Sequence, residues 1–134
     1  MKVTCGTDII EISRVKESIE KLGDKFLNRV FTEEEIKYCE LRGKSKFEHY
    51  AGRFAVKEAA FKAVSGVLED KYQIVWKDIE CLNDENGRPF VTIFSLNNNK
   101  IEGIDVSISH CRQYATANVV IVFKWLAISK RNSN

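Results

Sequence analysis

The feature that most constrains the fold of this chain is a change in hydrophobic periodicity partway along it. From residue 11 to about residue 64, apolar side chains recur at the three- and four-residue spacing of amphipathic helices. From residue 78 to residue 123, they fall in short runs separated by turn residues, as in β-strands. Helices in one half and strands in the other predict an α+β fold.

Three helices are predicted after an opening strand at residues 2–10. The first covers residues 11–23 and stops at Gly23. The second begins at Thr32, which forms a capping-box pattern with Glu35, and runs to about residue 42. The third is a long central helix at about residues 47–64. Its predicted apolar stripe contains the aromatic residues Phe47, Tyr50, Phe54 and Phe61.

Two antiparallel strand pairs are predicted in the second half. Residues 78–84 and 88–94 flank Asn86-Gly87, a strong signal for a hairpin turn. Residues 104–110 and 114–123 form the second pair, in which "VSIS" alternates apolar and polar side chains. The expected architecture is an antiparallel sheet packed with the central helix and shorter helices.

Composition limits the classes of function. A chain of 134 residues, 44% hydrophobic and 30% charged, is typical of a single globular domain that needs no disulfides. A net charge of +2 does not by itself indicate nucleic-acid binding, and no apolar run is long enough to span a bilayer. We therefore expect one domain over residues 1–134, with an extra polar tail at about 126–134. We expect a cytoplasmic location, with no nucleic acid or membrane as partner.

The four cysteines are far apart and contain no C-x-x-C pair. This spacing favours neither a zinc site nor a disulfide framework. We expect them to be buried thiols in a reducing compartment. They are Cys5, Cys39, Cys81 and Cys111.

The central helix places a carboxylate beside its own apolar stripe. Glu58 lies about 40° from Phe54 on a helical wheel, and Lys62 lies about 40° further on. A carboxylate at the margin of a core either protonates or finds a cation. One interpretation is a surface pair between Glu58 and Lys62. The other is a divalent metal ion shared with Asp8, which lies near the end of the opening strand.

Five motifs, in order along residues 3–122, favour the metal. They are "GTDIIEISR" (6–14), "FTEEE" (31–35), "RFAVKEAAFKA" (53–63), "NDENGRP" (83–89) and "VSISH" (106–110). Together they resemble the holo-acyl-carrier-protein synthase family, the small 4′-phosphopantetheinyl transferases. Two segments depart from the family pattern: the C-terminal extension at 124–134 and the asparagine-rich stretch at 94–103.

The resemblance implies a fold, a reaction and a catalytic centre. The fold would be that of the 4′-phosphopantetheinyl transferases. The reaction moves the phosphopantetheine arm of coenzyme A onto a serine of apo acyl carrier protein and releases adenosine 3′,5′-bisphosphate. Asp8 and Glu58 would hold Mg²⁺ against the coenzyme A pyrophosphate. Lys62 would contact the phosphates and assist the leaving group.

The resemblance also implies coenzyme-binding residues and an assembly. Arg53 and His110 would bind phosphate groups of the coenzyme. Gly87, Arg88 and Pro89 would lie against the adenine nucleotide bound by a neighbouring subunit. Because family members are compact trimers with sites at subunit interfaces, we expect a homotrimer.

A basic surface should receive the carrier protein, since acyl carrier proteins are acidic. Arg14, Lys21 and Lys25 fall within about 40° of each other if the first helix continues past Gly23. The more ordinary interpretation of such charges is a solvated helix face.

Several alternatives remain open from sequence alone. His110 by itself could be an ordinary histidine at a strand end, and residues 87–89 could be a hairpin turn without a ligand. The general base that takes the serine proton could be Glu58 or a water on the metal. A coenzyme- or carrier-binding module without turnover would be favoured if Asp8, Glu58 or Lys62 were missing, but all three are present. A magnesium-dependent nucleotide pyrophosphate hydrolase, with water as the nucleophile, is not excluded by the sequence.

Overall fold

The computed structural model describes residues 1–67, 74–96 and 100–124. The tail predicted at about 126–134 lies outside these ranges. The main elements, in chain order, are β1 (Lys2–Glu11), α1 (Ile12–Leu22), α2 (Asp24–Val30), α3 (Glu33–Glu40), α4 (Lys46–Ser65), the 3₁₀ helix η3 (Trp76–Asp78), β2 (Ile79–Asn83), β3 (Pro89–Ile93), β4 (Ile101–His110) and β5 (Tyr114–Phe123). The predicted α+β class, antiparallel strand pairs and long central helix are confirmed.

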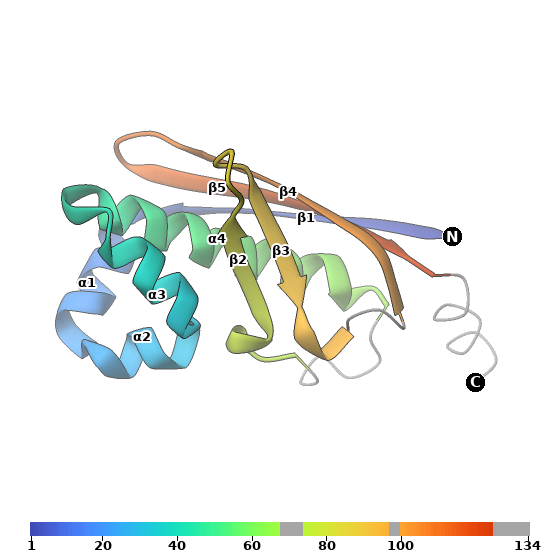
Figure 1. Ribbon diagram of the computed structural model, residues 1–134, viewed down its shortest axis with the longest axis horizontal. Helices are drawn as coiled ribbons and strands as arrows, with labels where there is room; N and C mark the ends of the chain where they lie inside the picture. The colour runs from blue at the N-terminus through green and yellow to red at the C-terminus, as the bar shows by residue number, and fades with distance from the viewer. Residues whose placement is uncertain (68–73, 97–99, 125–134) are drawn as a thin grey trace.

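Three strands form one antiparallel sheet in the order β1-β5-β4, and β2 and β3 form a separate hairpin. β1 pairs with β5 along its whole length, from Lys2 opposite Phe123 to Glu11 opposite Tyr114. Figure 1 shows α4 lying along one face of this sheet, with α1, α2 and α3 gathered near the N-terminal end of α4. The β2–β3 hairpin contacts both α4 and β4. The sheet and the helices therefore meet along α4, which carries the predicted site residues Arg53, Glu58 and Lys62.

The local signals for turns and caps are confirmed. Thr32 and Glu35 form the predicted capping box at the start of α3. Gly87 closes the β2–β3 turn with a φ of 80°, and its N–H donates to the carbonyl of Asp84 at 2.9 Å. This left-handed conformation favours glycine because it has no Cβ. Gly23 ends α1, also with a positive φ of 56°. The short helix α2 that follows was not predicted.

The sheet approaches α4 most closely at Gly6. A Cβ at this position would collide with the carbonyl oxygen of Ala59 and would lie 2.9 Å from the backbone nitrogen of Ala63. Only glycine therefore lets β1 lie this close to the helix. Asp8 is two residues further along, on the same face of β1, so this close approach brings its carboxylate to the side of α4.

The buried surface of α4 differs from the predicted aromatic stripe. Tyr50 is fully buried as expected, but the other three aromatic residues are only half-buried. Most of the fully buried positions are alanines, and Arg53 and Lys57 are buried with them. α4 contacts the sheet as well as α3 and β2, so a single-stripe pattern did not describe it.

The prediction that all four cysteines are buried is wrong for two of them. Cys39 and Cys81 are buried, and burial raises their pKa values to about 12 and about 11, so both are inert thiols. Cys5 is exposed because it alternates with the inward-facing Gly6, and Cys111 is exposed at the β4–β5 turn. No helix within the described ranges combines the length and apolarity needed to cross a membrane.

Candidate active site

A pocket of about 340 Å³ opens where β1 passes α4. It contains both carboxylates predicted to hold a metal, Asp8 from β1 and Glu58 from α4, together with the predicted carrier-protein residue Arg14. The lining residues are Asp8, Ile9, Ile10, Glu11, Arg14, Phe54, Glu58 and Tyr114. Two side chains fifty positions apart in the sequence thus meet in one pocket.

The electrostatics of this pocket are unbalanced. Glu58 is half-buried, and its pKa is raised first by burial and then by the nearby carboxylate of Asp8, while Lys62 partly offsets both. The ammonium of Lys62 lies 3.2 Å from Oδ1 of Asp8 and donates to the carbonyl of Thr7 at 2.9 Å. The ion pair of Lys62 is therefore with Asp8, and not with Glu58 as the surface-pair interpretation required. With every group ionised, the carboxylates of Asp8, Glu11 and Glu58 outnumber the cations of Arg14 and Lys62 by one, and a bound cation would compensate this local charge of −1.

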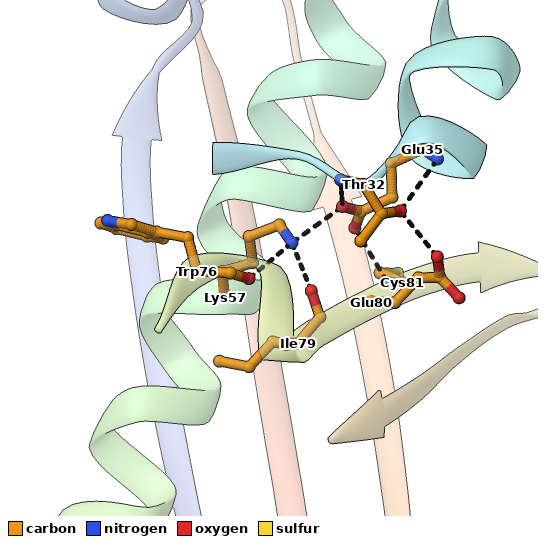
Figure 2. A network of polar contacts seen from close by, with 7 residues as sticks. All are labelled: Thr32, Glu35, Lys57, Trp76, Ile79, Glu80 and Cys81. Atoms are coloured by element: carbon orange, nitrogen blue, oxygen red, sulfur yellow. Dashed lines mark hydrogen bonds and ion pairs between the residues drawn. The ribbon is translucent and has the colours of Figure 1, made fainter. Parts of the chain in front are cut away.

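A second ion pair of α4 is fully buried, and the sequence analysis missed it. Lys57 Nζ lies 2.8 Å from Glu35 Oε1, and neither side chain is exposed to solvent at all. Burial lowers the pKa of Lys57, an effect that the Glu35 carboxylate opposes. Figure 2 shows the pair between α3, α4 and β2. The signal in the sequence was Lys57 itself, a lysine set among the small apolar residues of "FAVKEAA".

The predicted phosphate ligand Arg53 is almost completely buried, with 2% of its surface exposed. Its guanidinium carbon lies 4.1 Å from the centroid of the Tyr38 ring, and one terminal nitrogen donates to Oδ1 of Asn83. Its Nε has no hydrogen-bond partner among the described residues. Arg42 packs on the same ring, with its guanidinium carbon 4.0 Å from the centroid. The two guanidinium groups therefore concentrate positive charge around Tyr38.

His110 lies on the helix side of β4, opposite to the face that carries Ser107 and Ser109. It shares this face with Val106 and Ile108, because alternate residues of a strand point the same way. Its Nδ1 lies 3.7 Å from a carboxylate oxygen of Glu48 on α4, and its ring centroid is 6.5 Å from that of His49. The pKa of His49 is lowered by burial and then by neighbouring cations, which indicates a positive local potential.

The loop at 87–89 is separate from the carboxylates within one chain. Arg88 and Pro89 line a second pocket of about 390 Å³, beside Ser107 of β4. Arg88 lies 3.5 Å from Asp105 in an exposed ion pair. The lining of this pocket shares no residue with that of the Asp8 pocket.

Comparison with known proteins identifies the family. The sequence matches the model of the 4′-phosphopantetheinyl transferase superfamily over residues 4–119. The chain belongs to this superfamily. The predicted family resemblance is thereby confirmed, and all five motifs lie within the matched residues.

Several transferases of this superfamily are similar over nearly the whole chain. A holo-[acyl-carrier-protein] synthase of Protochlamydia amoebophila is 47% identical, across 90% of this chain and 98% of the relative. A crystal structure of the Bacillus anthracis synthase, in complex with CoA (3′,5′-ADP), is 37% identical with a TM-score of 0.71, covering 88% of this chain and 94% of that one. The Helicobacter pylori synthase in complex with coenzyme A is 29% identical with a TM-score of 0.76, covering 88% and 99%.

The basic residues predicted to form the carrier-protein surface of this transferase do not share one helix face. The Arg14 side chain is 76% exposed at the pocket, and its nearest carboxylate is Glu11 at 3.9 Å. Lys21 is exposed in the last turn of α1, but Lys25 lies on α2. The expectation of one continuous face is wrong because Gly23 ends α1 and redirects the chain.

Proposed function

We propose that this chain is a holo-acyl-carrier-protein synthase. It transfers the 4′-phosphopantetheine group of coenzyme A to a serine of apo acyl carrier protein and releases adenosine 3′,5′-bisphosphate. One observation carries the proposal: Asp8 and Glu58 line one pocket, and Lys62 pairs with Asp8, in a chain that is 47% identical to a synthase of that name.

Asp8 and Glu58 fit Mg²⁺ as its protein ligands. No cluster of three or more acidic, histidine or cysteine side chains suited to a metal occurs in the described residues. Two carboxylates nevertheless suit Mg²⁺, which commonly keeps its other positions for water and phosphate oxygens. When bound, the ion would act as a Lewis acid on the pyrophosphate of coenzyme A.

Lys62 supplies positive charge beside the two carboxylates. Its side chain is 55% exposed and already points to the pocket through Asp8. In the proposed reaction it contacts the pyrophosphate and stabilises the negative charge that grows on the leaving group. Glu58, with its raised pKa, is a candidate for the base that takes the serine proton.

The coenzyme would be bound between two subunits of a homotrimer. Arg53 and His110 hold its phosphate groups, and Gly87, Arg88 and Pro89 of a neighbouring subunit lie against the adenine nucleotide. Two observations support this arrangement. Within one chain the loop and the carboxylates line separate pockets. In addition, the face of the sheet turned away from α4 exposes large apolar side chains, namely Val3, Ile9, Tyr114 and Val120.

Arg14 is the residue best placed to meet the carrier protein. It lines the pocket of Asp8 and Glu58 while remaining mostly exposed, so an acidic partner can reach it as its serine enters. Lys21 and Lys25 would extend the basic surface across α1 and α2. A cytoplasmic location for the enzyme remains part of the proposal.

Mass spectrometry tests the reaction directly. The protein is incubated with apo carrier protein, coenzyme A and Mg²⁺, and the carrier is examined for the added mass of phosphopantetheine. Cleavage of coenzyme A without modification of the carrier would indicate a pyrophosphate hydrolase, and binding without any cleavage would indicate a binding module. Either result would contradict the proposal. Size-exclusion chromatography with light scattering tests the assembly, for which a mass three times that of one chain is expected.

A further inference from the structure

The buried pair of Lys57 and Glu35 forms a polar network in which every N–H donor of the lysine ammonium has an acceptor. Lys57 Nζ contacts three acceptors: Oε1 of Glu35 at 2.8 Å, the carbonyl of Trp76 at 3.0 Å and the carbonyl of Ile79. An ammonium has three N–H donors, so each one has a partner. Figure 2 shows these contacts converging between α4, η3 and β2.

The carboxylate of Glu35 extends the network into two backbones. Oε1 accepts from the N–H of Thr32, and Oε2 accepts from the N–H of Cys81, both at 2.9 Å. The Thr32 hydroxyl in turn donates to Glu80 at 2.6 Å. The pair therefore attaches both the start of α3 and the strand β2 to the centre of α4.

Stability alone does not account for this arrangement. Removing two charges from water costs about as much as their attraction returns, and apolar pairs of similar volume often stabilise a core equally well. What the network provides is a fixed position of β2 along α4, because directed hydrogen bonds specify register where apolar contacts do not.

A further contact between α4 and β2 lies nearer the turn of the β2–β3 hairpin. Ile79, Cys81 and Asn83 are alternate residues of β2 and so lie on one face of it. Arg53, one helical turn before Lys57, donates to the side chain of Asn83, and Nδ2 of Asn83 donates to the carbonyl of Gly87 at 2.9 Å. The loop that begins at Gly87 is thus connected to α4 through successive contacts along β2.

The same network supports a wall of the carboxylate pocket. The carbonyl of Trp76 is held by Lys57, and its ring stacks on Phe54 with a centroid distance of 5.1 Å. Phe54 lines the pocket of Asp8 and Glu58. The buried pair therefore contacts η3, whose Trp76 packs on the pocket wall, and β2, which continues to the loop at 87–89.

We propose that Lys57 and Glu35 are positioning residues that hold the β2–β3 hairpin in register on α4, and thereby place the loop at 87–89 for binding of the coenzyme. Neither side chain touches a substrate. Both act through the backbone of Trp76 and of the β2 residues Ile79 and Cys81. This inference rests on the proposed function, in which the loop contacts the nucleotide and the surface around Arg14 contacts the carrier protein. Loosening the register should therefore weaken coenzyme binding selectively.

The test uses the double variant Lys57→Met, Glu35→Gln, which removes both charges of the buried pair. The matched control is Lys46→Met, Glu40→Gln, the same exchange in a more exposed pair that joins the same two helices, with its Nζ–Oε1 distance at 3.3 Å. We expect the KM for coenzyme A to rise about tenfold in the first variant, while the KM for carrier protein changes less than about twofold. The control variant should keep the wild-type KM values for coenzyme A and for carrier protein.

Calorimetric titration with coenzyme A provides a readout that does not need turnover. The dissociation constant should rise in parallel with the KM in the double variant. If the wild-type chain binds coenzyme A but never modifies a carrier protein, the proposed function fails while this measurement still tests the positioning role.

A lower melting temperature with unchanged KM and dissociation constant for coenzyme A would show a purely structural role and overturn the proposal. An equal rise of both KM values would overturn it as well. If the double variant does not fold, Asn83→Ala decides, because it breaks the contacts of Asn83 with Arg53 and Gly87 and leaves the buried pair intact. It should reproduce the selective loss of coenzyme affinity, and an unchanged affinity would refute the positioning role.

Discussion

Lys57 and Glu58 are consecutive residues of α4, yet they belong to polar groups of opposite character. Around Lys57, each N–H donor of the ammonium has an acceptor, and the charge is balanced by Glu35 in complete burial. Around Glu58, the carboxylates of Asp8 and Glu11 and the guanidinium of Arg14 line a pocket that is open to solvent, Lys62 pairs with Asp8 beside it, and the pKa of Glu58 is raised. The first group is complete without a ligand, whereas the second lacks positive charge. Polar groups that bind ligands are recognised by this incompleteness.

The largest effect is expected from breaking the complete group. Lys57→Met leaves the Glu35 carboxylate buried without its cation, and should lower the free energy of unfolding by about 3–5 kcal/mol. Urea denaturation measures the change. Lys62→Met, which removes a largely exposed ammonium of the same helix, should cost far less. Equal losses in the two variants would erase the distinction drawn between the groups.

Breaking the incomplete group should affect catalysis and leave the fold intact. Glu58→Gln removes a proposed metal ligand, and we expect turnover to fall by about 10²- to 10³-fold, as when other preorganised electrostatic groups are removed. The phosphopantetheinylation rate at saturating Mg²⁺ checks this, with circular dichroism as the control for folding. Activity near that of the wild type would contradict the role of Glu58 as a ligand.

The close approach of β1 to α4 is what brings the incomplete group together. Gly6→Ala should push β1 away from α4, because the new methyl group would collide with the backbone of Ala59. We expect a loss of about 1–3 kcal/mol in the free energy of unfolding. Gly66→Ala is the control, since an added Cβ there meets nothing within 4 Å. If both variants have the same free energy of unfolding, close packing at Gly6 does not position Asp8.

The surface beside the open pocket should respond to salt. Arg14→Ala is expected to raise the KM for carrier protein by about five- to tenfold at low ionic strength, and by less at high salt, because an exposed charge acts through screened attraction. The KM for coenzyme A should stay unchanged. Steady-state kinetics at two salt concentrations measures both. A KM for carrier protein equal to that of the wild type would show that Arg14 does not contribute to carrier-protein binding.

The smallest effect concerns the pH dependence of stability. The raised pKa of Glu58 means that the folded protein keeps a proton that the unfolded chain has already lost. Without metal, stability attributable to this group should therefore fall as pH rises from its ordinary value of 4.5 through the raised pKa. Melting temperatures of the wild type and Glu58→Gln, measured across this range, should diverge. Parallel curves would mean that Glu58 is not perturbed.

The sequence alone was sufficient for the features that depend on neighbours in the chain. Thr32 and Glu35 predicted a capping box, Asn86-Gly87 predicted a turn, and the order of five motifs predicted the family. These signals were reliable because each rests on contacts within a few residues or on a pattern of residue types. The prediction that Gly23 stops a helix was also right, although the basic face expected to extend beyond it was not.

Only the tertiary structure decided the partner of each charged side chain. Glu35 looked complete as a capping residue, and nothing within reach along the helix showed that Lys57 would be buried against it. Likewise, Lys62 had a suitable neighbour at Glu58 but pairs with Asp8 instead. The reason is physical: the energy of a charge depends on its desolvation and on the groups packed around it, and here those groups come from β1, α3 and β2, which lie far from α4 in the chain.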